Sequence, residues 1–549
     1  MANSIILEAL TYSMLTYSIL YAKLHLFETT KPNEDHMGHT HSDAQGTNSF
    51  GTSRRGFLAG ATGLAFYSTL PLRAAAQGSG PTGSVVYGNA EPPTSNYWDP
   101  AAGFGLVDEQ VASLVHDSLL AFDADGGIGP GLATQWDVTS DRTVRLTLRE
   151  GVSFHDGTPL TAQDVKASID RLGEGELAQS MVVTPGISVS ILSPTEIEVA
   201  SPEAFGVILS SLAFIKILPK ANIDNPDNFG NGAMGTGPYR FVGFEGNDVV
   251  LEANEQYWGG APNVESVTFR YIEDAQARIN ALLSGQVDIL TRVSPEDLAR
   301  VKGNDDFYIN TDTPPSQIVA IYQHNGPLGD LKVRQALAHA IDREGIAASI
   351  MQGANPVGFS SLPTTAAYYE ELEPRFEFNL ERARELLAES SYPDGVTLRM
   401  STSTLVPNQL EIDQIIAASL QAIGINVEVE RLEVGAFRTS YNTYDINLNT
   451  LAIFNNDPDF VLGLYVGGAG EAIFHYNDPK YVELHAAQRA ATAENRQEAV
   501  TAAAQYLWDN QVTLYLSDEI WQFIVNRRIE GFRRAPVLGE NLIAQAQVN

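Results

Sequence analysis

The chain contains no cysteine among its 549 residues. This absence excludes disulfide bonds, a cysteine nucleophile and a thiolate metal site. It also excludes the lipid-bearing cysteine that tethers some exported proteins, so we expect an unanchored, soluble protein. Long hydrophobic runs are missing as well. No stretch after residue 77 is apolar for the roughly eighteen residues that indicate a membrane-spanning helix.

Positive charge is scarce. The sequence has 34 lysines and arginines against 67 aspartates and glutamates, and its formal net charge is −33. This balance argues against nucleic acid as a partner, because binding phosphates requires a basic surface. It also argues against adsorption to anionic lipid. The 44% hydrophobic and 18% charged residues are typical of a globular protein.

Motifs of common enzymes and metal sites are also missing. The sequence has no His-Glu-x-x-His, no Gly-x-Ser-x-Gly and no Walker loop. His475 and His485 are the closest histidines after residue 77, and their spacing is not that of a zinc site. We therefore expect no catalytic residues, no metal and no cofactor, and we regard an exported enzyme as the weaker alternative.

An export signal lies at residues 53–76. Arg54 and Arg55 precede Phe57-Leu58, a mildly apolar stretch follows, and Ala74 and Ala76 form a small-residue cleavage site. The order of these features predicts export by the twin-arginine translocase and a mature chain that begins at residue 77. Residues 1–76 are then an extension plus signal peptide, and Met37 is an alternative start.

Strand and helix patterns alternate along the mature chain. Val144, Leu146 and Leu148 alternate with polar residues and predict a half-buried strand. Thr161, with Asp164 three residues later, predicts a helix that begins with a capping box. Further helices are expected at 274–284, from Ser294, at 330–350 and at 411–423, with a strand at 425–429. Helix–glycine–strand units of this kind predict an α/β protein with mainly parallel sheets.

Several segments resemble the family 5 solute-binding proteins, the dipeptide-, oligopeptide- and nickel-type receptors of ABC importers. They are residues 132–136, 144–165, 235–239, 254–258, 333–343 and 457–460. The resemblance implies a two-lobed periplasmic binding protein fold of cluster C type, with an extra inserted domain and a ligand cleft that closes about a hinge. It places lobe one at 77–118, 234–318 and 515–549, the inserted domain at 119–233, and lobe two at 319–514.

In peptide-binding members of that family, a carboxylate shortly before an acidic-Pro pair holds the peptide's amino group. The equivalent position here is Phe454, followed by Asn455, Asn456 and Asp457. A buried ammonium needs an opposite charge, so the departure argues against simple peptides as ligands. An aromatic ring with two amides suits a neutral or hydroxylated ligand. Core packing is the alternative role of Phe454, and a structural role is the alternative for Asp457.

Two weaker candidates complete the predicted site. Asn96, Tyr97 and Trp98 combine an amide with two aromatic rings, which could stack on a ligand. Ser401 and Thr402 follow the predicted strand 396–400, at the strand end where α/β sheets bind ligands, with a solvated loop as the alternative.

The resemblance implies a periplasmic monomer that binds a peptide, a peptide-like compound, an opine or a sugar conjugate and delivers it to the permease subunits of an ABC importer. A receptor for metal chelates and a chemosensory binding protein are the alternatives.

Overall fold

The computed structural model describes residues 80–91, 99–102, 105–175, 177–312, 314–492, 494–537 and 542–549. The export signal predicted around Arg54, Arg55, Ala74 and Ala76 lies outside these residues. In the part of the chain that the structure describes, no helix is both long and apolar enough to cross a membrane.

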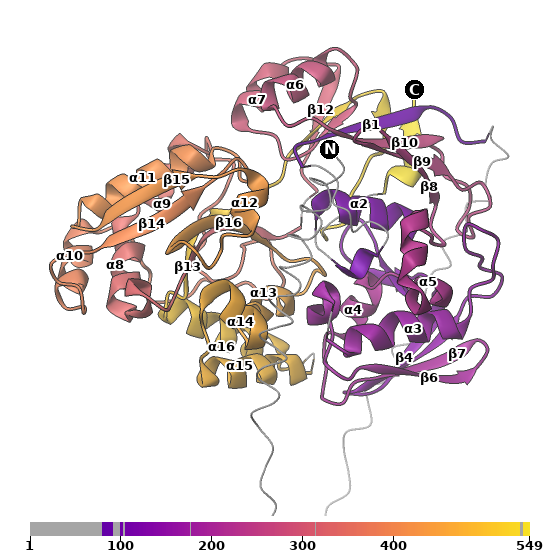
Figure 1. Ribbon diagram of the computed structural model, residues 1–549, viewed down its shortest axis with the longest axis horizontal. Helices are drawn as coiled ribbons and strands as arrows, with labels where there is room; N and C mark the ends of the chain where they lie inside the picture. The colour runs from indigo at the N-terminus through magenta and orange to yellow at the C-terminus, as the bar shows by residue number, and fades with distance from the viewer. Residues whose placement is uncertain are drawn as a thin grey trace, which may run out of the picture.

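A seven-stranded mixed sheet forms the core of one lobe, in the order β12-β18-β11-β1-β10-β9-β8. Strand β1 runs parallel to both β10 and β11, and the other neighbours are antiparallel. Figure 1 shows this sheet with α2 beneath it and α6 and α7 at one end. The elements are β1 (Ser84–Asn89), α2 (Leu106–Val115), β8 (Tyr239–Glu245), β9 (Asp248–Ala253), β10 (Ser266–Tyr271), α6 (Ala275–Leu283), β11 (Ile289–Leu290), α7 (Pro295–Val301), β12 (Phe307–Asn310) and β18 (Phe523–Asn526).

A four-stranded antiparallel sheet extends from this lobe, in the order β4-β5-β7-β6. The predicted alternation in β5 is confirmed, because Val144, Leu146 and Leu148 are buried. The capping box of Thr161 and Asp164 is confirmed at the start of α3. The elements are β2 (Leu120–Phe122), β3 (Ile128–Pro130), β4 (Ala133–Ser140), β5 (Thr143–Leu148), α3 (Ala162–Gly173), β6 (Ser188–Ser193), β7 (Glu196–Ala200), α4 (Ile208–Phe214) and α5 (Lys220–Asp224).

A five-stranded sheet forms the core of the other lobe, in the order β15-β14-β16-β13-β17 (Figure 1). The predicted helices appear here as α8, α9 and α11, and the predicted strand after Gly424 is β15. The elements are β13 (Ser316–Tyr322), α8 (Leu331–Ala340), α9 (Arg343–Ser349), α10 (Leu380–Ala388), β14 (Thr397–Thr402), α11 (Gln409–Gln421), β15 (Asn426–Arg431), α12 (Val434–Arg438), β16 (Ile446–Ala452), α13 (Asp459–Gly463), α14 (Gly467–Phe474), α15 (Pro479–Ala490), α16 (Arg496–Asp509) and β17 (Thr513–Asp518).

The expectation of mainly parallel sheets is wrong. The four-stranded sheet is entirely antiparallel, and each large sheet mixes both directions. Short connections explain the difference. Gly246 and Asn247 alone join β8 to β9, and a link of two residues can only connect antiparallel neighbours. Helix–strand periodicity does not show which strands pair in this way.

The Gly235–Tyr239 motif has a structural role. A Cβ atom on Gly235 would lie 2.0 Å from the carbonyl oxygen of Val115, at the end of α2. The backbone N–H of Gly237 donates to the same carbonyl at 2.9 Å. His155 is bonded to this motif as well, through its Nε2 and the carbonyl of Gly237 at 3.0 Å. The glycines therefore let the chain approach α2 and anchor the four-stranded region.

Two segments cross between the large sheets. One leads from β12 to β13, and the other, residues 519–522, connects β17 to β18. Next to this crossing, the backbone N–H of Glu519 donates to the carbonyl of Ser316, the first residue of β13, at 2.9 Å. The candidate site lies beside this crossing.

Candidate functional site

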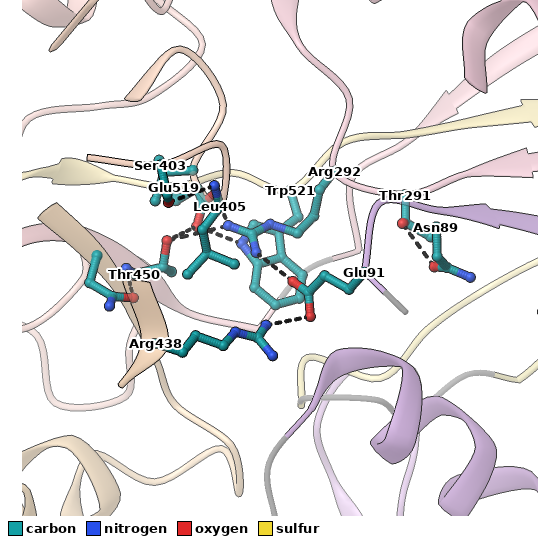
Figure 2. A network of polar contacts seen from close by, with 12 residues as sticks. Asn89, Glu91, Thr291, Arg292, Ser403, Leu405, Arg438, Thr450, Glu519 and Trp521 are labelled. Carbon is teal, nitrogen blue, oxygen red and sulfur yellow. Dashed lines mark hydrogen bonds and ion pairs between the residues drawn. The ribbon is translucent and has the colours of Figure 1, made fainter. Parts of the chain in front are cut away.

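A network of polar side chains joins the two lobes (Figure 2). Its centre is the guanidinium of Arg292, which follows β11 at a left-handed φ of 51°. Nη2 of Arg292 donates to Glu519 Oε1 at 2.7 Å and to Thr450 Oγ1 at 3.3 Å. The guanidinium carbon also lies 4.9 Å from the centre of the Trp521 ring, within the range of a cation–π contact. Strand β11, strand β16 and the crossing segment thus meet at one side chain.

Glu519 is the buried anion of this network. Besides Arg292, it accepts hydrogen bonds from Thr450 Oγ1 at 2.7 Å and from Trp521 Nε1 at 2.9 Å, both at Oε2. Its side chain is only 6% exposed. A buried carboxylate with three donors, one of them a cation, is compensated, so we assign Glu519 a positioning role.

Glu91 connects the lobes directly. It lies just after β1, at the carboxyl end of a strand in the seven-stranded sheet. Its Oε2 accepts a 2.6 Å hydrogen bond from Nη2 of Arg438, which ends α12 in the other lobe. Its Oε1 lies 3.7 Å from Nη1 of Arg292, too far for a hydrogen bond but within ion-pair distance. One carboxylate therefore faces two guanidinium groups from different lobes.

Asn89 and Thr291 extend the polar surface at the ends of β1 and β11. Thr291 Oγ1 donates to Asn89 Oδ1 at 3.0 Å. The Nδ2 of Asn89 is buried, and the structure gives it no hydrogen-bond partner. A small cavity adjoins the network on the side of the crossing segments, and its wall includes Arg292, Glu519 and Trp521. Donors and a cavity are thus together at the lobe junction.

Sequence reasoning missed Glu91, Arg292, Arg438 and Glu519. A signal for two of them exists in the sequence. Arg292 follows the buried pair Ile289–Leu290 after a single threonine, and Glu91 follows β1 in the same manner. Charged residues directly after a buried strand lie at the sheet edge where ligands bind. No comparable signal marks Arg438, because its place depends on the packing of the two lobes.

Phe454, predicted to contact ligand, is half-buried after β16. It packs against the two largest hydrophobic clusters, and its ring centre lies 4.3 Å from that of Phe460. Asn455 is buried, and its Oδ1 accepts from the backbone N–H of Asp457 at 3.4 Å. Asn456 Nδ2 donates to the carbonyl of Gly126, between β2 and β3, at 3.2 Å. The structure thus places both amides in contacts with the chain itself.

Asp457 forms a buried ion pair. Its Oδ1 accepts a 2.7 Å hydrogen bond from Nη2 of Arg496 in α16 and a 2.9 Å bond from the backbone N–H of Asp459. Burial raises the pKa of Asp457, although Arg496 acts in the opposite direction. This carboxylate is used to hold the loop before α13 against α16.

Ser401 and Thr402 belong to β14 itself and are fully buried, so the alternative of a solvated loop is wrong for them. Ser401 Oγ accepts a 2.6 Å hydrogen bond from Asn447 in β16. The strand is longer than predicted because both residues pair with β15. Asn96, Tyr97 and Trp98 lie outside the described residues. Within the described ranges, no group of three or more His, Asp or Glu side chains could hold a metal ion.

Comparisons with known proteins agree on the family. A family profile described as bacterial extracellular solute-binding proteins, family 5 Middle, matches residues 127–472. The chain is 23% identical to the glutathione-binding protein GsiB of Pectobacterium atrosepticum, over 80% of this chain and 89% of the relative. It is 27% identical to a probable di/tripeptide-binding protein 5 of Pseudomonas aeruginosa, over 77% and 88% of the two chains.

Comparison of structures agrees on the fold. The dipeptide binding protein from Pseudoalteromonas sp. SM9913, solved with Met-Leu, superposes with a TM-score of 0.78 and 22% identity. The match covers 85% of this chain and all of that one. The expected two-lobed α/β fold is therefore confirmed. This chain belongs to the bacterial extracellular solute-binding proteins of family 5.

Proposed function

We propose that this chain is the substrate-binding component of an ABC importer and that it holds its solute where the two lobes meet. The observation that carries the proposal is the polar network of Arg292, Glu91 and Arg438, which joins both lobes through one carboxylate. When two lobes close about a hinge, side chains of both lobes come together around the space between them. Charged side chains that meet there are placed to contact a solute held between the lobes. The solute then goes to the permease subunits in the inner membrane.

The proposed solute is a peptide-like compound, such as a modified peptide, an opine or a sugar conjugate. The curated relatives are named for glutathione and for di- and tripeptides, which favours this chemical class. The aromatic Phe454 stands where the resemblance expects the carboxylate that holds a peptide's amino group. The nearest acid, Asp457, is engaged by Arg496. A free peptide ammonium therefore lacks the expected partner.

Catalysis is not part of the proposal. The matched relatives and structures are named as binding proteins. Glu519, the buried acid of the network, has its hydrogen bonds from Arg292, Thr450 and Trp521 and is assigned a positioning role. A receptor for metal chelates remains the second candidate, since a chelate can bind through its organic ligand. A nickel-binding relative of Staphylococcus aureus, 25% identical over 58% of this chain, favours that alternative.

The proposed domain limits are those that the resemblance implies. We propose lobe one at 77–118, 234–318 and 515–549, an inserted domain at 119–233 and lobe two at 319–514. Strands β13 and β17 lie at these limits and pair with each other in the five-stranded sheet. We also propose a periplasmic monomer exported by the twin-arginine route.

Native mass spectrometry of the protein purified without denaturation tests this function. We expect a discrete added mass that matches a peptide-like compound, and uptake of that compound should stop in cells that lack the protein. An added mass of a metal chelate would favour the second candidate. Unchanged uptake of the identified compound in the deletion strain would contradict the importer assignment.

A further inference from the structure

Four charged side chains at the lobe junction balance one another. Arg292 and Arg438 each carry one positive charge, and Glu91 and Glu519 each carry one negative charge. Their side chains are 12%, 26%, 12% and 6% exposed, in that order. Residues 92–98, which follow Glu91, include no charged residue. The network as a whole is therefore neutral, and each member is largely removed from water.

The two carboxylates are held differently. Glu519 accepts three hydrogen bonds of 2.7 to 2.9 Å, so its position is fixed by Arg292, Thr450 and Trp521. Among the described residues, the hydrogen bond to Glu91 comes from Arg438 at 2.6 Å, and the other oxygen of Glu91 lies 3.7 Å from Arg292. Glu91 thus faces two guanidinium groups but forms a hydrogen bond with only that of Arg438, while Arg292 lies at ion-pair distance (Figure 2).

Charge in such surroundings must be compensated, because leaving one ion unpaired away from water costs several kcal/mol. A solute with a net negative charge would add an uncompensated anion to a network that is already neutral. A solute without net charge, such as a zwitterion or a polyhydroxylated compound, adds none. Without the charge of Glu91, the same residues would carry one excess positive charge shared between the lobes.

We propose that Glu91 determines the charge selectivity of this site: it neutralises Arg292 and Arg438, so that the site accepts solutes of no net charge and rejects anions. The proposal rests on the function given above, since it concerns the same lobe junction. It also narrows the solute class to zwitterionic or uncharged compounds. Glu91 acts here as a built-in counter-ion: it pairs with Arg438 and lies within ion-pair distance of Arg292, and without it the four side chains would carry a net positive charge.

The test is the binding of succinate, a dianion without an ammonium group, to the purified protein in buffer of low ionic strength, where ion pairing is least screened. Calorimetry should detect no binding to the wild type. Glu91→Gln should bind succinate at least about tenfold more tightly than the wild type, the size expected when one close charge pair changes. Glu91→Ala carries the same expectation if the glutamine variant folds poorly.

Three further variants make the test specific. Glu91→Asp keeps the charge and should not gain binding. Glu198→Gln removes one negative charge from an ion pair with Arg145 on the four-stranded sheet, so it controls for net charge and should not gain binding. Glu91→Gln combined with Arg438→Gln restores neutrality and should lose the gain.

Succinate binding to the wild type as tight as to Glu91→Gln would overturn the proposal. So would a folded Glu91→Gln protein, verified by circular dichroism, that gains no affinity. These measurements require neither the importer nor the natural solute. Failure of the uptake experiment would therefore reject the proposed function while leaving the succinate result to decide the role of Glu91.

Discussion

Arg489 forms a bidentate ion pair with Asp459: Nε lies 3.0 Å from Oδ1, and Nη2 lies 3.0 Å from Oδ2. The same guanidinium donates to the carbonyl of Met181 at 3.3 Å and stacks 5.2 Å from the ring centre of Phe205. Burial acts to raise the pKa of Asp459, but Arg489 and His485 together outweigh it and keep the pKa below its usual value. Arg489 thus joins α15, α13 and the four-stranded region.

Removing Arg489 should destabilise the protein strongly. Arg489→Met leaves the carboxylate of Asp459, which is 2% exposed, without its cation. Loss of one partner of a buried pair costs about 3–5 kcal/mol. We expect urea unfolding to report a free energy of unfolding lower by this amount, partly restored when Asp459→Asn is added. Arg382→Met breaks an exposed pair with Glu385 and should cost less than about 1 kcal/mol. Equal losses of stability in Arg489→Met and Arg382→Met would contradict the view that Arg489 compensates a buried carboxylate.

Unmodified dipeptides should bind weakly or not at all. Phe454 supplies no charge for a peptide ammonium, and Asp457 is paired with Arg496. We expect calorimetric titration with Ala-Ala to give a Kd weaker than about 1 mM, which corresponds to less than about 4 kcal/mol of binding. The compound that native mass spectrometry identifies serves as the positive control. Micromolar affinity for Ala-Ala would show that another carboxylate takes the ammonium.

The sequence predicted local structure well and strand pairing poorly. Capping residues such as Thr161 and Ser294 act within one helical turn, so their effect can be read directly along the chain. The direction of β8 against β9 depends on a two-residue link, and the pairing of β13 with β17 joins segments about two hundred residues apart. Periodicity holds no information about either.

The candidate site was predicted less completely for the same reason. Phe454 was proposed because the resemblance fixes its place relative to Pro458, and its role stays a prediction. Glu91 and Arg438 are 347 residues apart and form a 2.6 Å pair only when the two lobes are folded together. Two residues so far apart in the sequence form no local sequence pattern, so the pair can be identified only from the structure.

Asp413 should make the protein less stable as the pH rises. Its carboxyl is fully buried in α11, and burial raises its pKa to about 8. The unfolded chain has the ordinary value near 3.8, so the folded state binds more protons between these limits. The free energy of unfolding then falls as the pH rises from about 4 to about 8, by at most about 1.4 kcal/mol per unit.

Asp413→Asn should remove this dependence. We expect the free energy of unfolding of the wild type to fall relative to that of the variant between pH 5 and pH 8. Urea unfolding at each pH measures both values. Asp394→Asn, at an exposed position, is the matched control and should leave the profile unchanged. A wild-type profile parallel to that of Asp413→Asn would show that this carboxyl is ionised in the folded protein.

The buried His116 and the partly buried His155 should act in the opposite direction. Burial lowers the pKa of His116 to about 3, with His155 as the next cause, and burial lowers the pKa of His155 to about 4. Below the ordinary value near 6.5, the unfolded chain binds protons that the folded protein does not. Stability should therefore fall as the pH drops from about 6.5 toward 4. In urea unfolding at each pH, a double variant, His116→Gln with His155→Gln, should lose less free energy of unfolding between pH 6.5 and 4 than the wild type. His339→Gln should lose as much as the wild type.

Export should depend on the paired arginines. Arg54 and Arg55, followed by an apolar stretch and a small-residue cleavage site, predict recognition by the twin-arginine translocase. Because a guanidinium offers a planar fork of donors that an ammonium lacks, we expect Arg54→Lys with Arg55→Lys to block export although the charge is kept. Immunoblots of periplasmic and cytoplasmic fractions should then show only the uncleaved precursor, in the cytoplasm. Arg73→Lys, close to the cleavage site, is the matched control and should be exported normally. A mature periplasmic product from the double variant would mean that a different route carries the protein across the membrane.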